Sequence, residues 1–213
     1  NEGDMRARTN NGDTVEIGIT GMNLSDSEWH HVALTVNSGD ITRPGDLARG
    51  LPAESPDQNY RGFAAIDNNP ATKILQTVPN SGVEIQTRGG VVVALALTSS
   101  DNEPTRDPSS FKLLGSNNGG KSYDIIATGV VPEFTARIQR VSIPIENSTF
   151  YRDYQVLFPS VRNDNDEMQL AEVELIENSA DTGMALYIDG KNVDQTLDVA
   201  WLPGSVEGIS TLG

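Results

Sequence analysis

YQVLFPSVR at residues 154–162 and MQLAEVEL at residues 168–175 determine the fold class of this chain, because both contain short strand-like stretches and apolar and polar residues largely alternate along the second. Alternation at period two is typical of β-strands with one buried face. Similar short stretches recur on both sides of these two, separated by Gly, Pro, Asn and Asp residues that are typical of turns. No stretch keeps apolar residues at helical spacing over three turns. We predict an all-β protein with its best strands at residues 14–19, 29–36, 91–97, 111–114, 124–127, 140–145, 154–158, 170–176 and 184–189.

Many short strands of this kind are typical of a β-sandwich or jelly roll. The length of 213 residues allows one large domain or two small ones, and either can bury a core. Apolar residues make up 37% of the chain, and no apolar run approaches the roughly 18 residues of a membrane span. The composition therefore predicts a soluble protein with no membrane insertion.

The charge of the chain narrows the classes of partner. Lys and Arg number 15 against 30 Asp and Glu, which gives a net charge of −15. This charge repels the phosphate backbone that dominates nucleic-acid affinity, so we expect no nucleic-acid partner and an affinity for cations.

The chain contains no cysteine, which excludes disulfides and thiolate metal sites. An acidic, oxygen-rich surface suits calcium, which stabilises β-domains without disulfides. The chain begins at Asn1 and shows no signal peptide. We expect an excised piece of a longer protein that is secreted, and therefore an extracellular or cell-surface location.

Five motifs follow one another in the middle of the chain: AAIDNNPAT at residues 64–72, RDP at 106–108, FKLLGSNNG at 111–119, YQVLFPSVR at 154–162 and MQLAEVEL at 168–175. In order and spacing they resemble the discoidin family, also called the coagulation factor V/VIII C-type domains. The resemblance implies an eight-stranded jelly-roll β-sandwich, which we place at residues 39–178.

The two flanks resemble a different family. SEWHHVALTV at residues 27–36 and MALYIDGKNV at residues 184–193 look like two consecutive central strands of laminin-G or concanavalin-like sandwiches, which a short turn normally joins. The resemblance implies that residues 1–38 and 179–213 are two parts of one laminin-G-like sheet, with the discoidin-like domain inserted into its hairpin. This pairing of families looks bacterial.

These flanks are too short for a complete laminin-G domain. An isolated half-sandwich leaves strand edges and an apolar face uncovered. We therefore expect the missing laminin-G-like sheet to come from elsewhere in the parent protein or from another subunit.

The loop DNNPAT at residues 67–72 is the strongest chemical candidate. Calcium takes six to eight oxygen ligands, and short Asp, Asn and Thr side chains in a tight loop can present several of them. An Asx-type turn held by its own hydrogen bonds explains the same residues equally well. The resemblance favours a structural calcium ion, held by the carbonyls of Ala64, Asn69 and Ala171 and the side chains of Asp67, Thr72 and Glu172.

Carbohydrate binding on such sandwiches requires an aromatic face and planar polar groups. The candidates near the calcium-side loops are Tyr60, Arg61, Arg106, Arg162 and Asn163. Family members also bind phospholipid headgroups or proteins, but the negative charge of this chain argues against anionic membranes.

GSNNGGKS at residues 115–122 matches the expression for a phosphate-binding P-loop. A phosphate cradle must lead into a helix, whereas YDIIA at residues 123–127 is typical of a strand. We therefore interpret the segment as a hairpin turn. The two histidines, His30 and His31, are adjacent and point to opposite faces of a strand, so they cannot form a metal centre or a catalytic triad easily.

These observations predict a non-catalytic extracellular module that attaches a larger protein to carbohydrate. The alternative is a structural or assembly domain of a cell-surface protein or filament, with the flanking strands completed by a neighbouring chain or segment.

Overall fold

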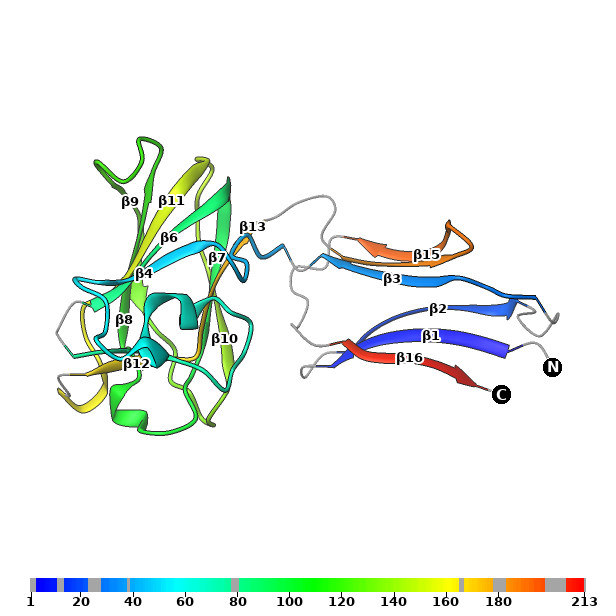
Figure 1. Cartoon of the computed structure of the whole chain (residues 1–213), viewed down its shortest axis with the longest axis horizontal. Coiled ribbons are helices and arrows are strands. Elements are labelled where there is room, and N and C mark those ends of the chain that lie inside the picture. Colours follow the sequence, from blue (N-terminus) through cyan, green and yellow to red (C-terminus); the bar gives the residue numbers. More distant parts are fainter. Residues whose placement is uncertain are drawn as a thin grey trace. The chain divides into compact units, whose positions relative to one another are not determined.

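The computed structural model describes residues 3–10, 14–22, 28–37, 39–77, 81–164, 167–177, 183–197 and 206–212 (Figure 1). The chain divides into two compact units. Unit 1 comprises residues 1–39 and 178–213, and unit 2 comprises residues 40–177. The predicted domain bounds at residues 38, 178 and 179 lie outside the described residues. No helix among the described residues is long and apolar enough to span a membrane.

Unit 2 is a β-sandwich of two antiparallel sheets. A five-stranded sheet has the order β4-β6-β11-β8-β9, and a three-stranded sheet has the order β10-β7-β13. Their bounds are Leu47–Leu51 (β4), Ser81–Gly90 (β6), Val92–Thr98 (β7), Ser110–Ser116 (β8), Asp124–Val130 (β9), Arg140–Pro144 (β10), Tyr151–Phe158 (β11) and Glu172–Glu177 (β13). The predicted all-β class and β-sandwich are confirmed.

Smaller elements complete unit 2 at one end of the sandwich, where β12 and the short helices lie (Figure 1). A two-stranded sheet pairs β5 with β12, and four short 3₁₀ helices lie between strands. Their bounds are Ile74–Gln76 (β5), Met168–Leu170 (β12), Gln58–Tyr60 (η1), Gly62–Ala65 (η2), Pro104–Arg106 (η3) and Arg162–Asp164 (η4).

The core of unit 2 lies between its two sheets. Alternate residues of β6, β8 and β11 meet alternate residues of β7 and β13 in one buried apolar cluster. Tyr154 of β11 is fully buried, and its hydroxyl donates to the carbonyls of Gly90 (2.8 Å) and Tyr151 (3.0 Å). Burial raises the pKa of this hydroxyl to about 12, so it stays a donor. The bonds satisfy the polar end of a large core residue.

The chain enters and leaves unit 2 at neighbouring positions. Asp40 and Ile176 form an isolated antiparallel bridge, and the Ile41 amide donates to the Leu175 carbonyl at 2.9 Å. Ile41 is fully buried in the core. The segment from 39 to 60 therefore supplies both a core residue and strand β4.

Unit 1 contains two three-stranded sheets, with the orders β16-β1-β2 and β15-β14-β3. Their bounds are Gly3–Asn10 (β1), Thr14–Met22 (β2), Val32–Asn37 (β3), Gly183–Ile188 (β14), Lys191–Leu197 (β15) and Val206–Leu212 (β16). β3 and β14 pair antiparallel, with Val32 opposite Ile188, so the two flanking segments are neighbours as predicted. The unit is more than one interrupted hairpin, however, and its laminin-G-like nature stays a prediction.

The predicted strand at residues 29–36 begins later, at Val32, because Asp189 fixes the residues before it. Asp189 accepts hydrogen bonds from the His31 amide (2.9 Å) and contacts His30 Nδ1 (2.8 Å), and its own amide donates to the His31 carbonyl (2.8 Å). These bonds lower the pKa of the Asp189 carboxyl, the one to His30 most. The histidines thus anchor a chain segment to the β14–β15 turn.

Candidate functional site

The Asp67 loop is folded on its own polar groups. The Thr72 hydroxyl lies 2.9 and 2.8 Å from the two carboxylate oxygens of Asp67 and 2.7 Å from the carbonyl oxygen of Asn69. The Asn69 amide donates to Asp67 Oδ1 (3.0 Å), and the Ala71 amide donates to the Asn69 side chain (3.2 Å). The Asx-type turn that the sequence allowed is therefore present.

Glu172, at the start of β13, lies against this loop. The residue is 6% exposed, and both of its carboxylate oxygens are buried without a hydrogen-bond partner among the described residues. Burial, and then the charge of Asp67, raise the pKa of Glu172 to about 8, against a smaller opposing effect of the Asn69 and Asn68 amides. A buried carboxylate that lacks partners is costly, so its position calls for a cation or a proton.

The donor set at this locus suits calcium rather than a transition metal. Among the described residues, no group of three or more His, Cys, Asp or Glu is placed to hold a metal ion. Asp67, Asn69, Thr72 and Glu172 instead offer carboxylate, carbonyl and hydroxyl oxygens, which calcium accepts. Ala64, in η2, and Ala171, directly before Glu172, are both buried. The oxygen types of Asp67, Asn69, Thr72 and Glu172 are therefore those that calcium accepts.

Short-range packing explains where η2 lies. A Cβ on Gly62 would approach the backbone carbon of Arg49 to 2.3 Å, so only glycine lets this turn lie against β4. The Gly62 amide donates to Glu54 at 3.0 Å. Ala64 and Ala65 point inward and are buried, whereas the ring of Phe63 is 48% exposed. Phe63 is an exposed aromatic beside the Asp67 loop that our sequence reasoning missed, although its small neighbours on both sides could have indicated it.

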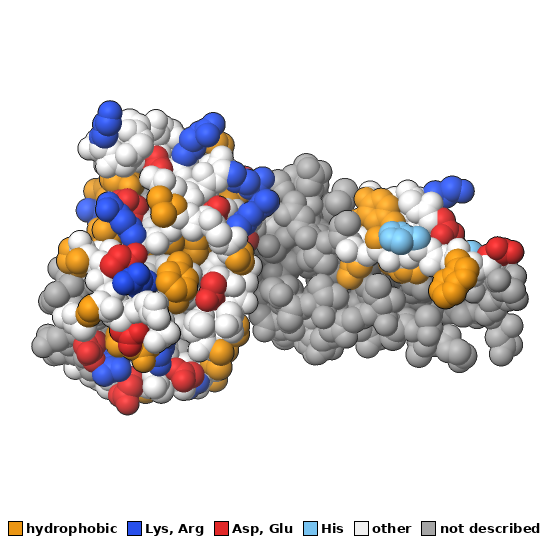
Figure 2. Space-filling model, in the orientation of Figure 1, with side chains coloured by type: hydrophobic (Ala, Val, Ile, Leu, Met, Phe, Trp, Pro, Cys, Tyr) orange, Lys and Arg blue, Asp and Glu red, His pale blue; other side chains and the backbone are white. Residues whose placement is uncertain are grey.

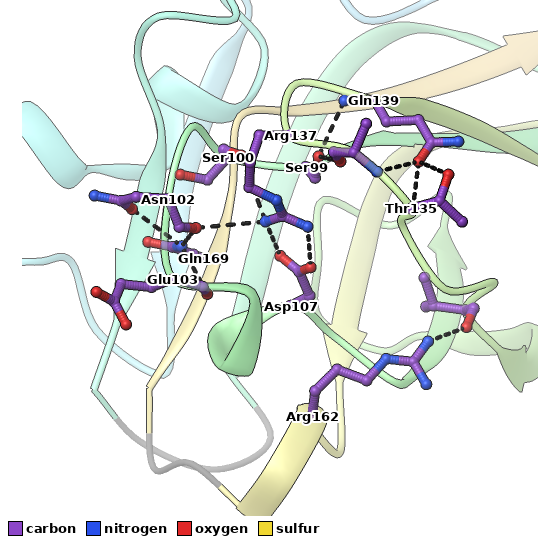
Figure 3. Close-up of polar contacts among 12 residues, drawn as sticks. Ser99, Ser100, Asn102, Glu103, Asp107, Thr135, Arg137, Gln139, Arg162 and Gln169 are labelled. Atoms are coloured by element: carbon purple, nitrogen blue, oxygen red, sulfur yellow. Dashed lines mark hydrogen bonds and ion pairs between the residues drawn. The ribbon is translucent and has the colours of Figure 1, made fainter.

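Three of the five predicted carbohydrate-binding residues come together. Arg106 ends η3, and Arg162 and Asn163 lie in η4, which contacts η3. Arg106 forms an ion pair with Glu167. Arg162 donates from Nη2 to the Val131 carbonyl at 2.7 Å, as Figure 3 shows. The Nε atoms of both arginines are buried without a hydrogen-bond partner among the described residues.

Asn163 is exposed and has a left-handed backbone, with φ of 54°. Tyr60 and Arg61 belong to a different segment, at η1 and just after it. Tyr60 is half-buried, and Arg61 donates to the Ser55 carbonyl at 3.4 Å. The structure therefore places Arg106, Arg162 and Asn163 on adjoining loops, and places Tyr60 and Arg61 on the chain segment that leads to Phe63.

A buried ion pair supports the loop that carries Arg106. Arg137 donates through Nη1 and Nη2 to the two oxygens of Asp107, at 2.9 and 2.6 Å (Figure 3). The Asp107 side chain is only 3% exposed. The Asp107 carbonyl also accepts from the Arg162 amide at 2.9 Å, so this residue joins η3 to η4.

The segment 115–122 is a hairpin turn, as predicted. The Asn118 side-chain oxygen accepts from the amides of Lys121 (3.0 Å) and Ser122 (3.1 Å), and the Ser116 hydroxyl accepts from the Gly120 amide (3.2 Å). The amides that a phosphate would need are thus already bonded within the turn, and the chain continues into strand β9.

Sequence comparison gives one short match. No family model matches the chain. A stretch of 87 residues is 32% identical to a peptide-N(4)-(N-acetyl-beta-glucosaminyl)asparagine amidase of Arabidopsis thaliana. The match covers 39% of this chain, and the chain spans only 12% of the plant protein.

Solved structures give a broader likeness. The family 32 carbohydrate-binding module of Clostridium perfringens NanJ, in complex with galactose, is similar with a TM-score of 0.55 at 14% identity, over 66% of this chain and 100% of that one. A second family 32 module of C. perfringens, in complex with GalNAc-β-1,3-galactose, has a TM-score of 0.55 at 11% identity, over 64% and 99% of the two chains. A fucose-binding module of Streptococcus pneumoniae has a TM-score of 0.50 at 19% identity, over 66% and 96%. Identities this low show the fold alone, and over about two thirds of its length the chain has the discoidin-like β-sandwich fold of the family 32 carbohydrate-binding modules.

Proposed function

We propose that unit 2 is a non-catalytic module that binds a neutral carbohydrate through the loops that carry Arg106, Arg162 and Asn163. The observation that carries this proposal is the contact between η3 and η4, the two turns that carry these three planar polar residues, in a fold shared with modules that bind galactose and fucose. Planar donors and acceptors recognise sugar hydroxyls, and an exposed aromatic ring, which Phe63 of η2 supplies, is the usual apolar face for a pyranose.

Charge favours a neutral ligand. Glu167 balances the charge of Arg106, and the whole chain carries a net charge of −15. Figure 2 shows Lys and Arg side chains mixed with Asp and Glu over the visible face of unit 2, with apolar patches between them. A surface of mixed sign attracts hydroxyl-rich neutral ligands without a strong preference for anions such as phospholipid headgroups.

Replacement of Arg106 by alanine should weaken carbohydrate binding at least about tenfold, because a charged hydrogen-bond donor is lost. A glycan array would identify the sugar, and isothermal titration calorimetry would measure its affinity. Arg88→Ala is the matched control, because Arg88 also forms an ion pair with a glutamate, Glu177, but lies at the end of β6. Equal affinities of Arg106→Ala and Arg88→Ala, or a wild-type protein that binds no glycan, would contradict the proposal.

We further propose a structural calcium ion at the Asp67 loop. The side chains of Asp67, Thr72 and Glu172 and the carbonyls of Ala64, Asn69 and Ala171 would hold it. The buried, unpartnered carboxylate of Glu172 supports this assignment. When bound, calcium would supply positive charge that offsets the two carboxylates, and its role would be to fix the loop rather than to catalyse a reaction.

We also propose that the parent protein acts outside the cell in adhesion and that a partner sheet completes the laminin-G-like strands of unit 1. The specific observation in favour of a partner is Trp29, whose side chain is fully exposed. If the assembly alternative holds, the protein should self-associate in sedimentation velocity experiments and Trp29→Ser should reduce this association. A monomer at all concentrations would argue against self-assembly.

A further inference from the structure

The loop of residues 99–107, which ends in Arg106 and Asp107, is held from inside the protein by a glutamine of β12. Gln169 is fully buried. Its Nε2 donates to the backbone carbonyls of Asn102 (2.5 Å) and Glu103 (3.2 Å), and Figure 3 shows its side chain directed at this turn. Because backbone carbonyls are the acceptors, the glutamine fixes the backbone conformation of the loop rather than the position of one side chain.

A lysine next to the Asp67 loop holds the same turn from another side. Lys73 Nζ donates to Asp101 Oδ1 (2.8 Å) and to the side-chain oxygen of Asn102 (2.9 Å). The lysine side chain is only 15% exposed, although Asp101 is 55% exposed. The hydrogen bond from Lys73 is the main cause of a lowered pKa of Asp101. A lysine this little exposed marks a defined contact, unlike the fully solvated ion pairs of most surfaces.

Gln169 lies in a two-stranded ribbon, and Lys73 directly precedes its other strand. β5 and β12 pair antiparallel, with Gln169 opposite Leu75. The Asp67 loop leads through Lys73 into β5, and β12 leads out to Ala171 and Glu172. Both strands of the ribbon therefore meet the Asp67–Glu172 locus at one end. The side chains of Lys73 and Gln169 hold the 99–107 loop.

The conformation of the loop requires such support. Glu103 has a left-handed backbone, with φ of 43° and ψ of 70°, which a non-glycine residue adopts only where its surroundings impose it. The turn it starts brings the Arg106 amide to the Glu103 carbonyl (3.0 Å) and the Asp107 amide to the Pro104 carbonyl (3.2 Å). The direction in which Arg106 leaves the backbone thus depends on a residue whose carbonyl Gln169 holds.

We propose that Lys73 and Gln169 are positioning residues that hold the 99–107 loop in the shape that presents Arg106, and that they transmit order at the Asp67–Glu172 locus to this loop. This inference rests on the proposed carbohydrate site. It adds that the cation locus and the sugar site are coupled through the β5–β12 ribbon, so that a cation at one tightens the other.

The test uses Lys73→Met and Gln169→Leu, with Lys121→Met as a matched control, since Lys121 is exposed in the β8–β9 turn. Amide hydrogen exchange of Arg106 and Asp107, followed by NMR, reports the loop without any sugar. We expect exchange to accelerate about tenfold in Lys73→Met and Gln169→Leu, as for the loss of one charged or buried hydrogen bond. Lys73→Arg, which keeps a charged donor, should restore protection.

Added calcium should slow exchange of the Arg106 amide in the wild-type protein and in Lys121→Met, but not in Lys73→Met. Affinity for the sugar found on the array should fall with the loss of protection. Unchanged exchange in Lys73→Met and Gln169→Leu would overturn the inference, even if sugar binding were lost. A wild-type protein that binds no sugar, with exchange altered as expected, would instead overturn the proposed function and leave the holding role established.

Discussion

Glu172→Gln should make the calcium-free protein more stable at neutral pH and should abolish its stabilisation by calcium. The Glu172 carboxylate is buried without hydrogen-bond partners, so its charge costs free energy in the folded state. Its pKa of about 8 in the folded protein, against 4.5 as the ordinary value, corresponds to a few kcal/mol. An isosteric neutral amide removes this cost, and we expect a gain of about 2 kcal/mol at pH 7.

The sign of the pH dependence follows from the same shift. The folded pKa of Glu172 lies above the unfolded value, so the folded protein binds more protons between about pH 4.5 and pH 8. Without calcium, this residue should therefore contribute more stability as the pH falls from 8 towards 4.5. Calcium requires the ionised form, so its affinity should fall over the same range.

Urea unfolding with calcium or with chelator, at pH 7, measures both effects. Calcium at 100 times its dissociation constant should stabilise the wild-type protein by about 2.7 kcal/mol and the variant not at all, so the order of stabilities should reverse. Glu174→Gln is the matched control on the same strand, because Glu174 is paired with Arg140 and lies outside the locus. A wild-type protein with the same stability in calcium and in chelator would exclude the calcium site.

Arg137→Ala should destabilise unit 2 by about 3 to 5 kcal/mol, because it leaves the buried carboxylate of Asp107 without its partner. The fork of two hydrogen bonds is lost, together with contacts from Nη1 to the Ser100 (3.5 Å) and Asn102 (3.4 Å) carbonyls. An effect of this size is a large part of the stability of a single domain.

Replacing both partners, with Arg137→Met and Asp107→Asn, should recover part of the loss, because no charge is then stranded. Arg49→Ala is the comparison variant. Arg49 pairs with Glu84 at 2.9 Å, but its side chain is 60% exposed, and its removal should cost less than about 1 kcal/mol. The free energies of unfolding of the wild-type protein, Arg137→Ala, the double variant and Arg49→Ala should be measured by chemical unfolding at pH 7. Equal losses of stability in Arg137→Ala and Arg49→Ala would refute the argument.

Strands with clear alternation were predictable from sequence, whereas strands built around glycine were not. β6, the central partner of β4 and β11, was missed because its sequence SGVEIQTRGG places glycines at both ends. A Cβ on Gly82 would lie 2.0 Å from the Val156 carbonyl oxygen, so the glycine permits close strand packing instead of ending the strand. This contact depends on the partner strand, which local pattern does not reveal.

Likewise, only the part of the candidate site that is contiguous in the sequence could be predicted. The Asp67 loop could be found because its oxygens are consecutive in the sequence, and Glu172 was added by resemblance alone. Its missing hydrogen-bond partners became visible only in the fold. The contacts of Lys73 with Asp101 and of Gln169 with Asn102 join residues far apart in the chain, and no spacing rule predicts such pairs.

The neighbouring ends of unit 2 have a mechanical consequence. The first and last residues of the unit meet at the Asp40–Ile176 bridge and the Ile41–Leu175 hydrogen bond. Tension applied between residues 40 and 177 therefore breaks the backbone contacts of this junction one after another. The sheets bear the load only after the junction has opened. A pulling experiment on the unit should show a first yield at low force when the junction opens, while the sandwich and its loops stay folded.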